Sequence, residues 1–119
     1  MIGVDVVKNS RIEDALKRFG DRFLSRVFTP REIDYCMSQK NTVPCLAARW
    51  ACKEAVLKAF YQEFGILLRF KEIEVLGNSG KPAEVVIRRE EVRDLLRGRR
   101  IIVSLSHERD YSVAVALIR

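Results

Sequence analysis

Three charged side chains interrupt an apolar helical segment near the middle of the chain. The stretch RWACKEAVLKAF carries Lys53, Glu54 and Lys58 among Ala, Cys, Val and Leu. Glu54 and Lys58 stand at positions i and i+4, the spacing of an ordinary ion pair on a helix surface. Because the apolar neighbours leave such a helix only a narrow polar edge, the same spacing also suits a site for charged groups. The residues alone leave both interpretations open.

Asp5 poses a similar question in the apolar, β-branched run IGVDVV. An ionised carboxylate inside a short strand is costly unless it is paired, bonded to amides or bound to a cation. Magnesium takes one or two carboxylates beside phosphate oxygens and water, so a candidate site for magnesium and a polyphosphate is present. Its members are Asp5, Lys53, Glu54, Lys58 and His107. An exposed strand end for Asp5 and a solvated turn for His107 are the plainer alternatives.

The charge balance indicates an anionic partner. The chain has 119 residues and a formal net charge of +6, and its arginines outnumber its lysines. Arginine suits bidentate pairing with phosphate or carboxylate. Composition does not choose among a nucleic acid, a phosphorylated small molecule and an acidic protein. With 48% hydrophobic and 32% charged residues, the chain is expected to form an ordinary globular domain.

The cysteines give no sign of a metal cluster. Cys36, Cys45 and Cys52 contain no C-x-x-C pair and His107 is the only histidine, so a zinc site is not expected. We expect reduced thiols in the cytoplasm, with Cys52 packed in the core. The N-terminus lacks signal-peptide features, and no apolar run reaches the roughly 18 residues of a membrane span. The sequence therefore predicts neither secretion nor membrane insertion.

The beginning of the sequence predicts a strand that leads into a helix. Residues 2–7 form the apolar strand, with Asp5 as its charged member. Residues 10–20 have the pattern of a short amphipathic helix, in which Ser10 and Glu13 stand in capping-box register.

Two further helices are predicted before the middle of the chain. Thr29 as N-cap, Pro30 in the first turn and Glu32 three residues after the cap start the first of them. Residues 46–64 form the longest helical candidate. It carries alanines at helical spacing that would let it sit close against a sheet, namely Ala48, Ala51, Ala55 and Ala59.

The second half has the composition typical of strands. EIEVL, EVVIR, RIIVSLS and YSVAVALI are β-rich, GNSGKP predicts a turn between the first two, and REEVRDLLRG predicts a short helix before the third. HERD would close a C-terminal hairpin. We therefore predict a single α+β domain over residues 1–119, in which a small antiparallel sheet packs against one long and several short helices.

Five segments carry a resemblance to a known family. They are IGVDVVKNSRI, FTPREIDYC, LAARWACKEAVLKAF, GNSGKP and VSLSHERDYSVAVAL. In this order, and over nearly the whole chain, they resemble the small 4'-phosphopantetheinyl transferases of the holo-[acyl-carrier-protein] synthase type. The combination of G-x-D with A-x-K-E-A-x-x-K-A is specific for that family.

The resemblance implies a reaction and a metal. The 4'-phosphopantetheine arm of coenzyme A would be transferred to a serine of apo-acyl carrier protein, leaving adenosine 3',5'-bisphosphate, with magnesium as cofactor, in cytoplasmic fatty acid biosynthesis. By position, Asp5 and Glu54 resemble the metal ligands. The base that accepts the serine proton is either Glu54 itself or a metal-held water that relays the proton to Glu54 or Asp5.

Further positions resemble the family's coenzyme A contacts. Lys53 and Lys58 match its helix lysines, which neutralise phosphates, and Lys58 is assigned to catalysis together with Glu54. His107 matches a histidine that contacts a nucleotide phosphate. Arg49 is similar to an arginine that reaches the 3'-phosphate.

Basic residues near the start resemble the family's contacts with the acidic carrier protein. Arg11, Arg18 and Arg22 recur at helical spacing, although a solvated face is the plainer interpretation and Gly20 could interrupt the helix. The resemblance also implies a homotrimer whose active sites lie between neighbouring subunits.

Three positions depart from the family's usual pattern. Lys8 stands where Glu is common, Cys52 where Ala is common, and Glu108 where Thr usually follows the histidine. We expect Lys8 and Glu108 to affect the fine geometry of the site and not the class of reaction.

A non-catalytic basic module that binds nucleic acid is the alternative, because the net charge of +6 also suits a phosphate backbone. The sequence shows no aromatic-rich strand of the RRM type. We therefore expect an enzyme with neither a nucleic acid nor a membrane partner.

Overall fold

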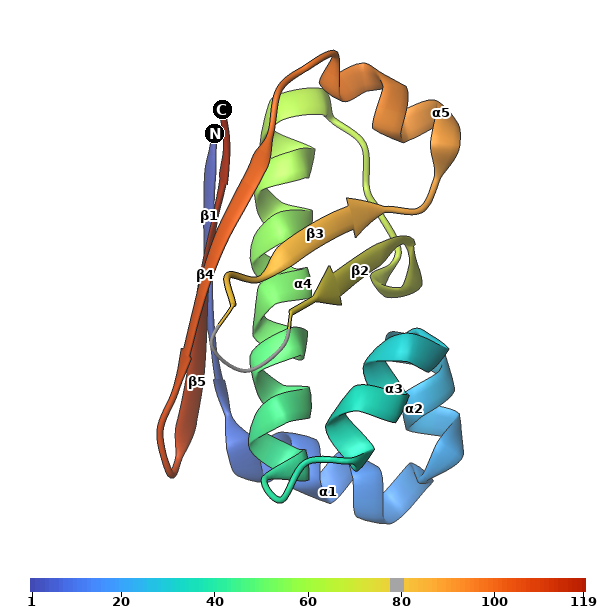
Figure 1. Ribbon diagram of the computed structural model, residues 1–119, viewed down its shortest axis with the longest axis vertical. Coiled ribbons are helices and arrows are strands. Elements are labelled where there is room, and N and C mark those ends of the chain that lie inside the picture. Colours follow the sequence, from blue (N-terminus) through green and yellow to red (C-terminus); the bar gives the residue numbers. More distant parts are fainter. Residues whose placement is uncertain (78–80) are drawn as a thin grey trace.

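One long helix, α4, lies between a three-stranded sheet and a two-stranded sheet (Figure 1). The computed structural model describes residues 1–77 and 81–119, and the turn expected at GNSGKP falls on residues 78–80, outside the described residues. In chain order the elements are β1 (Ile2–Lys8), α1 (Asn9–Phe19), α2 (Asp21–Val27), α3 (Pro30–Met37), α4 (Thr42–Phe64), η1 (Phe70–Glu72), β2 (Ile73–Leu76), β3 (Glu84–Ile87), α5 (Glu90–Arg93), η2 (Asp94–Leu96), β4 (Ile101–His107) and β5 (Tyr111–Ile118).

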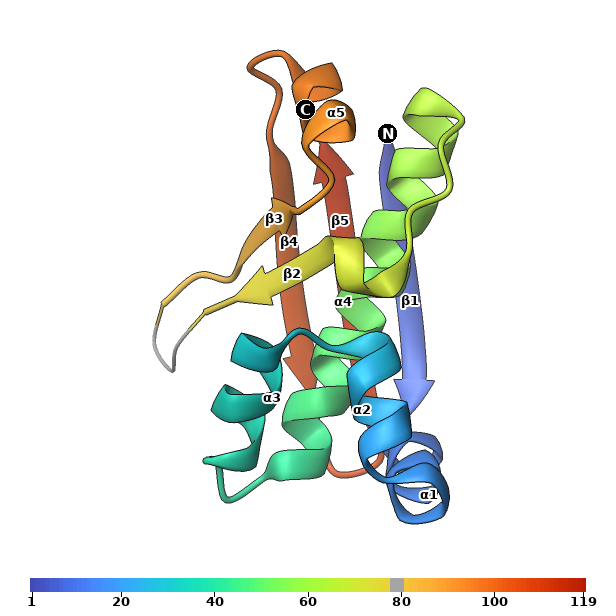
Figure 2. The ribbon, with the colours of Figure 1, turned by 90° about the vertical axis from the view of Figure 1, so that its right-hand side faces the viewer.

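The predicted α+β class is confirmed, and its strands divide into two sheets. The larger sheet has the order β1-β5-β4 and the smaller one pairs β2 with β3, and every pairing is antiparallel. Figure 2 shows β2 beside α4 and β3 over β4, while α1, α2 and α3 gather at one end of the long helix. Within the described residues, the structure has no helix long and apolar enough to cross a membrane.

Helix α4 begins four residues earlier than the sequence predicts. Pro44 is its third residue, where the missing N–H would have had no partner within the helix. The predicted alanine stripe is buried against the core at all four positions. The helix ends at Phe64, and the next residue, Gly65, has a φ of 70° and so takes the left-handed conformation that glycine favours.

Gly3 lets β1 lie directly on α4. A Cβ at Gly3 would overlap the carbonyl oxygen of Ala55 and come within 3.0 Å of the amide nitrogen of Ala59. Any larger residue would push the strand away from the helix. Because Asp5 is two residues further along the same face of β1, this close approach brings its carboxylate to α4.

Of the two predicted capping boxes, one is present in the structure and the other is not. Thr29 and Glu32 form the predicted box at α3. The box predicted for Ser10 and Glu13 is wrong, because β1 continues without a break into α1 and Ser10 is already inside the helix. Gly20, with a φ of 52°, separates α1 from α2, so Arg11 and Arg18 lie on one helix and Arg22 lies on the next.

The expectation of three reduced thiols is wrong for two of them. Cys36 at the end of α3 and Cys45 in the first turn of α4 form a disulfide, with 5.5 Å between their Cα atoms. Sequence spacing did not reveal the pair, because α3 and α4 meet only after the connecting segment turns back. Cys52 is a free, buried thiol as predicted.

Candidate functional site

Asp5, Glu54 and Lys58 meet where β1 crosses α4. Asp5 pairs in register with Ala114 of β5, and its side chain, 16% exposed, lies on the face of the strand that packs on α4. Lys58 is 47% exposed, and its Nζ lies 3.0 Å from Asp5 Oδ1 and donates to the Val4 carbonyl at 3.2 Å. Lys58 thus forms its ion pair with Asp5 on β1, whereas the i, i+4 spacing had suggested Glu54.

Glu54 is half-buried one turn before Lys58 and has a perturbed pKa. Desolvation raises the pKa of its carboxyl, and the nearby negative charge of Asp5 raises it further, while Lys58 and Arg11 act in the opposite direction. Two carboxylates that repel each other at a helix edge form a place where a cation is favourable. The geometry brings Asp5, Glu54 and Lys58 together as the sequence predicts.

Lys53 does not belong to this edge, and its predicted phosphate contact is corrected by the structure. The side chain is 0% exposed, and its ammonium lies 2.7 Å from Glu32 Oε1. The same ammonium donates to the carbonyls of Phe70 at 2.9 Å and Ile73 at 2.5 Å. All three of its protons therefore have partners inside the protein.

A second carboxylate completes the polar network around Lys53. Glu32 accepts hydrogen bonds from the amides of Thr29 at 2.8 Å and Val75 at 2.7 Å. Glu74, which is also buried, accepts from the Thr29 hydroxyl at 2.5 Å. The network fixes α3, α4 and β2 to one another, so Lys53 has a structural role. The sequence did not reveal it because Glu32 lies 21 positions away in the chain.

Arg49 and His107 line one cavity of about 780 Å³, on another side of α4. Lys40 and Lys81 line it too, so its charged residues are cations. A cavity of this size and charge suits a phosphorylated ligand of nucleotide size. Asp5, Glu54 and Lys58 are not among its lining residues.

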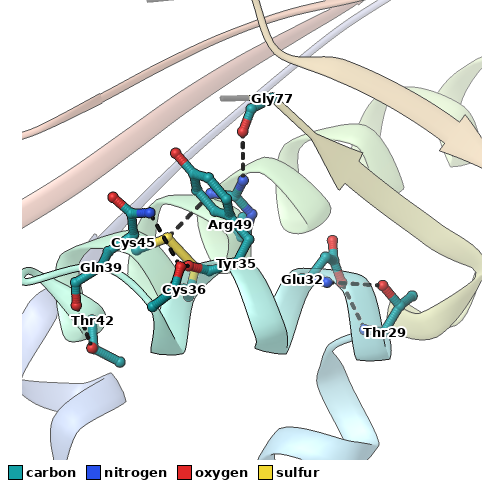
Figure 3. The surroundings of a disulfide bond; sticks show 10 residues. Thr29, Glu32, Tyr35, Cys36, Gln39, Thr42, Cys45, Arg49 and Gly77 are labelled. Atoms are coloured by element: carbon teal, nitrogen blue, oxygen red, sulfur yellow. Dashed lines mark hydrogen bonds between the residues drawn. A yellow bond between two sulfur atoms is a disulfide. The ribbon is translucent and has the colours of Figure 1, made fainter. Parts of the chain in front are cut away.

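The guanidinium of Arg49 is held from several sides (Figure 3). It lies over the Tyr35 ring, 4.7 Å from the ring centre, and donates to the Gly77 carbonyl at 3.2 Å and to Cys45 Sγ at 3.4 Å. Its buried Nε has no hydrogen-bond partner within the part of the chain that the structure describes. Burial lowers the pKa of Arg49, which stays a cation.

Asn9 is a positioning residue that the sequence did not single out. It is buried, and its Nδ2 donates to the carbonyls of Glu108 at 3.0 Å and Arg109 at 3.1 Å, while Oδ1 accepts from Ser112 Oγ at 2.7 Å. These bonds tie the start of α1 to the β4–β5 hairpin that carries His107. A buried polar residue between a strand and a helix was the available signal.

Glu108 and Lys8, two departures from the family pattern, both lie near this hairpin. Glu108 Oε1 accepts from the amides of Asp110 at 2.9 Å and Tyr111 at 2.7 Å, which shapes the turn. Its carboxylate is thereby directed to the backbone of the turn. Lys8 pairs with Tyr111 at the end of β1, three residues from Asp5.

The arginines expected to contact a carrier protein lie on α1 and α2. Arg11 lies near enough to Glu54 to lower its pKa, and Arg18 is exposed near the end of α1. Arg22 lines a largely apolar groove of about 650 Å³ between α2, α4 and η1. Its other lining residues include Phe23, Trp50, Leu57 and the arginines 26 and 69.

Within the described residues, Asp5 and Glu54 do not belong to a larger cluster of acidic or metal-binding side chains. Among residues 1–77 and 81–119, three or more His, Cys, Asp or Glu side chains do not gather as a metal cluster. Asp5 and Glu54 are the two side chains here that could hold a cation.

One face of the larger sheet exposes apolar side chains. Ile2, Val4 and Val6 on β1 are 59–61% exposed, and Val113 and Val115 on β5 lie beside them in register. A patch of this composition commonly marks a protein interface.

Comparisons with known proteins agree over nearly the full length of the chain. Residues 1–116 match the model of the 4'-phosphopantetheinyl transferase superfamily. The chain is 67% identical to "Holo-[acyl-carrier-protein] synthase" of Aquifex aeolicus over 119 residues, covering 100% of this chain and 98% of that protein. It is 42% identical to the protein of the same name from Chlamydia trachomatis serovar D, covering 98% and 96%.

Solved structures show the same fold. The Helicobacter pylori holo-[acyl-carrier-protein] synthase in complex with coenzyme A has a TM-score of 0.85 and 30% identity, and each chain is covered in full. A coenzyme A complex of the synthase from Chronobacterium ammoniagenes has a TM-score of 0.82 and 32% identity, covering 99% of this chain and 95% of that one.

Proposed function

The chain belongs to the 4'-phosphopantetheinyl transferase superfamily, and from this premise we propose that Asp5, Glu54 and Lys58 form its reaction centre. The enzyme transfers the 4'-phosphopantetheine group of coenzyme A to a serine of apo-acyl carrier protein and releases adenosine 3',5'-bisphosphate. This modification serves fatty acid biosynthesis, and we place it in the cytoplasm. The observation that carries the proposal is the meeting of two carboxylates and a lysine where β1 crosses α4.

Asp5 and Glu54 suit a magnesium ion. Their mutual repulsion helps to raise the pKa of Glu54, and a hard cation between them would relieve it. Two carboxylates with room for substrate oxygens and water are the donor set that magnesium prefers. When bound, the metal would neutralise charge on the coenzyme A pyrophosphate.

Lys58 and Glu54 have complementary tasks in this account. Lys58 now donates to Asp5 and to the Val4 carbonyl, and its half-exposed ammonium can turn to a phosphate oxygen of the substrate. Glu54, with its raised pKa, is suited to take the proton from the attacking serine hydroxyl, directly or through a water.

The cavity at Arg49 and His107 would hold the nucleotide part of coenzyme A. Its cations match the phosphates of that ligand. The cavity and the carboxylate pair are lined by different residues of one subunit. A homotrimer, in which the exposed face of β1 and β5 packs between subunits, would set the cavity of one subunit against the carboxylates of the next.

The carrier protein would dock on α1 and α2. Arg11, Arg18 and Arg22 provide positive charge for its acidic surface, which favours fast association. The apolar groove beside Arg22 offers a place for apolar side chains. Arg11, close to Glu54, would guide the serine to the reaction centre.

Mass spectrometry of a purified apo-acyl carrier protein tests the proposal. The carrier is incubated with coenzyme A and the enzyme, with and without magnesium, and we expect a gain of one phosphopantetheine only with metal. Glu54→Gln should abolish the gain, while the matched control Glu90→Gln, on the distant and exposed α5, should keep it. Full activity of Glu54→Gln would contradict the assignment of the reaction centre.

A further inference from the structure

We propose that the Cys36–Cys45 disulfide is a thiol-exchange site whose redox state sets the affinity of the Arg49 cavity for coenzyme A. The inference deepens the proposed function and rests on it, because the cavity is taken to hold the nucleotide. The bond joins the end of α3 to the first turn of α4 (Figure 3). The chain between its two cysteines supplies Gln39, Lys40 and Asn41 to the lining of the cavity.

The disulfide includes or adjoins two of the groups that hold the Arg49 guanidinium. Cys45 Sγ accepts a hydrogen bond from the guanidinium at 3.4 Å, and Tyr35, over whose ring the guanidinium lies, is the residue next to Cys36. The third support, the Gly77 carbonyl, comes from another part of the chain. Opening the disulfide would therefore let Cys45 Sγ and the Tyr35 ring move independently of each other. The Arg49 guanidinium would then be held less firmly.

The two sulfur atoms differ in accessibility. Cys45 is partly exposed and lines the cavity, whereas Cys36 is 0% exposed. A small dithiol entering the cavity would attack Cys45 Sγ as a thiolate; the S–S bond breaks, and Cys36 leaves as a thiolate and takes a proton. The second thiol of the reductant then displaces Cys45, leaving two protein thiols and one oxidised, cyclic reductant.

Reduction should loosen the cavity wall without unfolding it. Thr42 Oγ1 donates to the Gln39 carbonyl at 3.0 Å, and Ser38 Oγ donates to the Tyr35 carbonyl at 2.7 Å, so the segment keeps local bonds. The ligand would then have to order a mobile segment on binding. Ordering one or two side chains corresponds to a loss of about threefold to tenfold in affinity for coenzyme A.

The coupling must act in both directions. If the oxidised form binds coenzyme A more tightly, bound coenzyme A must favour the oxidised form by the same factor. A ligand in the cavity also covers Cys45, the sulfur that a reductant reaches. We therefore expect coenzyme A to slow reduction of the disulfide.

The test compares the purified enzyme before and after dithiothreitol treatment. Alkylation with iodoacetamide in denaturant, followed by mass spectrometry, should give one modified cysteine before reduction and three after it. Isothermal titration with coenzyme A and with adenosine 3',5'-bisphosphate should then show the threefold to tenfold weaker binding in the reduced protein. The Michaelis constant for the carrier protein should not change.

Two variants separate the disulfide from other thiol effects. Cys52→Ala removes the buried free thiol and should respond to dithiothreitol as the unaltered protein does. Cys36→Ala/Cys45→Ala should bind coenzyme A with the affinity of the reduced form and be insensitive to dithiothreitol. Thermal unfolding of this double variant should show that it remains folded at the temperature of the titration.

The outcomes distinguish this inference from the proposed function. Three alkylated cysteines before reduction, or equal affinities in both redox states, would overturn the exchange site and leave the transferase assignment intact. Failure of the oxidised protein to bind either nucleotide would overturn both the cavity assignment and the inference that rests on it. Weaker binding on reduction that the double variant reproduces would support the proposal.

Discussion

Lys53 and Lys58 lie five residues apart on α4 and have opposite surroundings. Lys53 is fully buried and its ammonium is bound by Glu32 and two backbone carbonyls. Lys58 is 47% exposed and pairs with Asp5 at the surface. The buried lysine is occupied by the fold, whereas the exposed lysine can exchange its partner for a substrate. Burial and partners, not residue type, separate the structural region from the reactive one.

Glu54→Gln should have the largest effect on activity and almost none on the fold. A neutral amide cannot act as a base or hold a cation, so we expect transfer to fall about 10²–10⁴-fold. Stability should stay equal or rise, because Gln removes a carboxylate whose pKa is raised by desolvation and by the nearby charge of Asp5. Mass spectrometry of the carrier measures the transfer rate, and urea unfolding measures the stability. A variant that is both inactive and unfolded would contradict the assignment of Glu54 to the reactive region.

Lys53→Ala should have the largest effect on the fold. It leaves the Glu32 carboxylate buried without its cation, which typically costs about 3–5 kcal/mol of unfolding free energy. Urea unfolding followed by Trp50 fluorescence measures the loss. Lys17→Ala is the control, since Lys17 is exposed and should lose less than about 1 kcal/mol. Equal stability of the two variants would show that the buried network does not hold α3 to α4.

Lys58→Ala should reduce activity with little change in stability. Loss of one charged hydrogen bond to a substrate phosphate, about 1.5–3 kcal/mol, corresponds to a roughly 10- to 150-fold lower kcat/KM. The ion pair with Asp5 lies at the surface, so unfolding should change by about 1 kcal/mol or less. A large loss of stability with normal specific activity would show that Lys58, like Lys53, stabilises the fold and does not take part in the reaction.

Asn9→Leu tests whether a structural contact outside α4 also supports the site. The variant leaves the carbonyls of Glu108 and Arg109 and the Ser112 hydroxyl without partners, at a cost of about 1–3 kcal/mol. We expect a higher KM for coenzyme A, because the hairpin carries His107. If the variant is destabilised but its kinetics are unaltered, Asn9 stabilises the fold and does not support the coenzyme A site.

The smallest effect is expected for alkylation of the buried Cys52 thiol in the native protein. Burial raises the pKa of its thiol to about 12, so the unreactive thiol form predominates well above neutral pH. Iodoacetamide should leave Cys52 unmodified in the native protein at pH 8 and modify it after denaturation. Rapid labelling of the native protein would show that the core around α4 opens.

Local sequence patterns predicted the parts of the fold that depend on neighbours in the chain. The box at Thr29 and Glu32, the alanine stripe of α4 and the strands of both sheets follow from spacing and composition. The predicted start of α4 is four residues too late, because SQKNTVP has the composition of a polar loop, whereas Pro44 fits inside the first turn of the helix.

Contacts between distant segments were harder to foresee. The charges of Lys53 and Glu54 look equivalent in sequence, and only the position of Glu32, on another helix, assigns Lys53 to the interior. The Cys36–Cys45 bond depends on how α3 meets α4. Gly3 was the missed local signal for the reaction centre, since a glycine inside a strand often marks a close backbone approach.

The most direct test of the division between the two lysines is transfer activity in two matched variants. Lys53→Met with Glu32→Gln replaces the buried ion pair by neutral groups of similar shape, and Lys58→Met neutralises the exposed lysine. Measured as phosphopantetheine added to the carrier per folded enzyme, the double variant should keep activity within several-fold, and Lys58→Met should lose about 10-fold or more. A folded double variant without activity, beside an active Lys58→Met, would contradict the account.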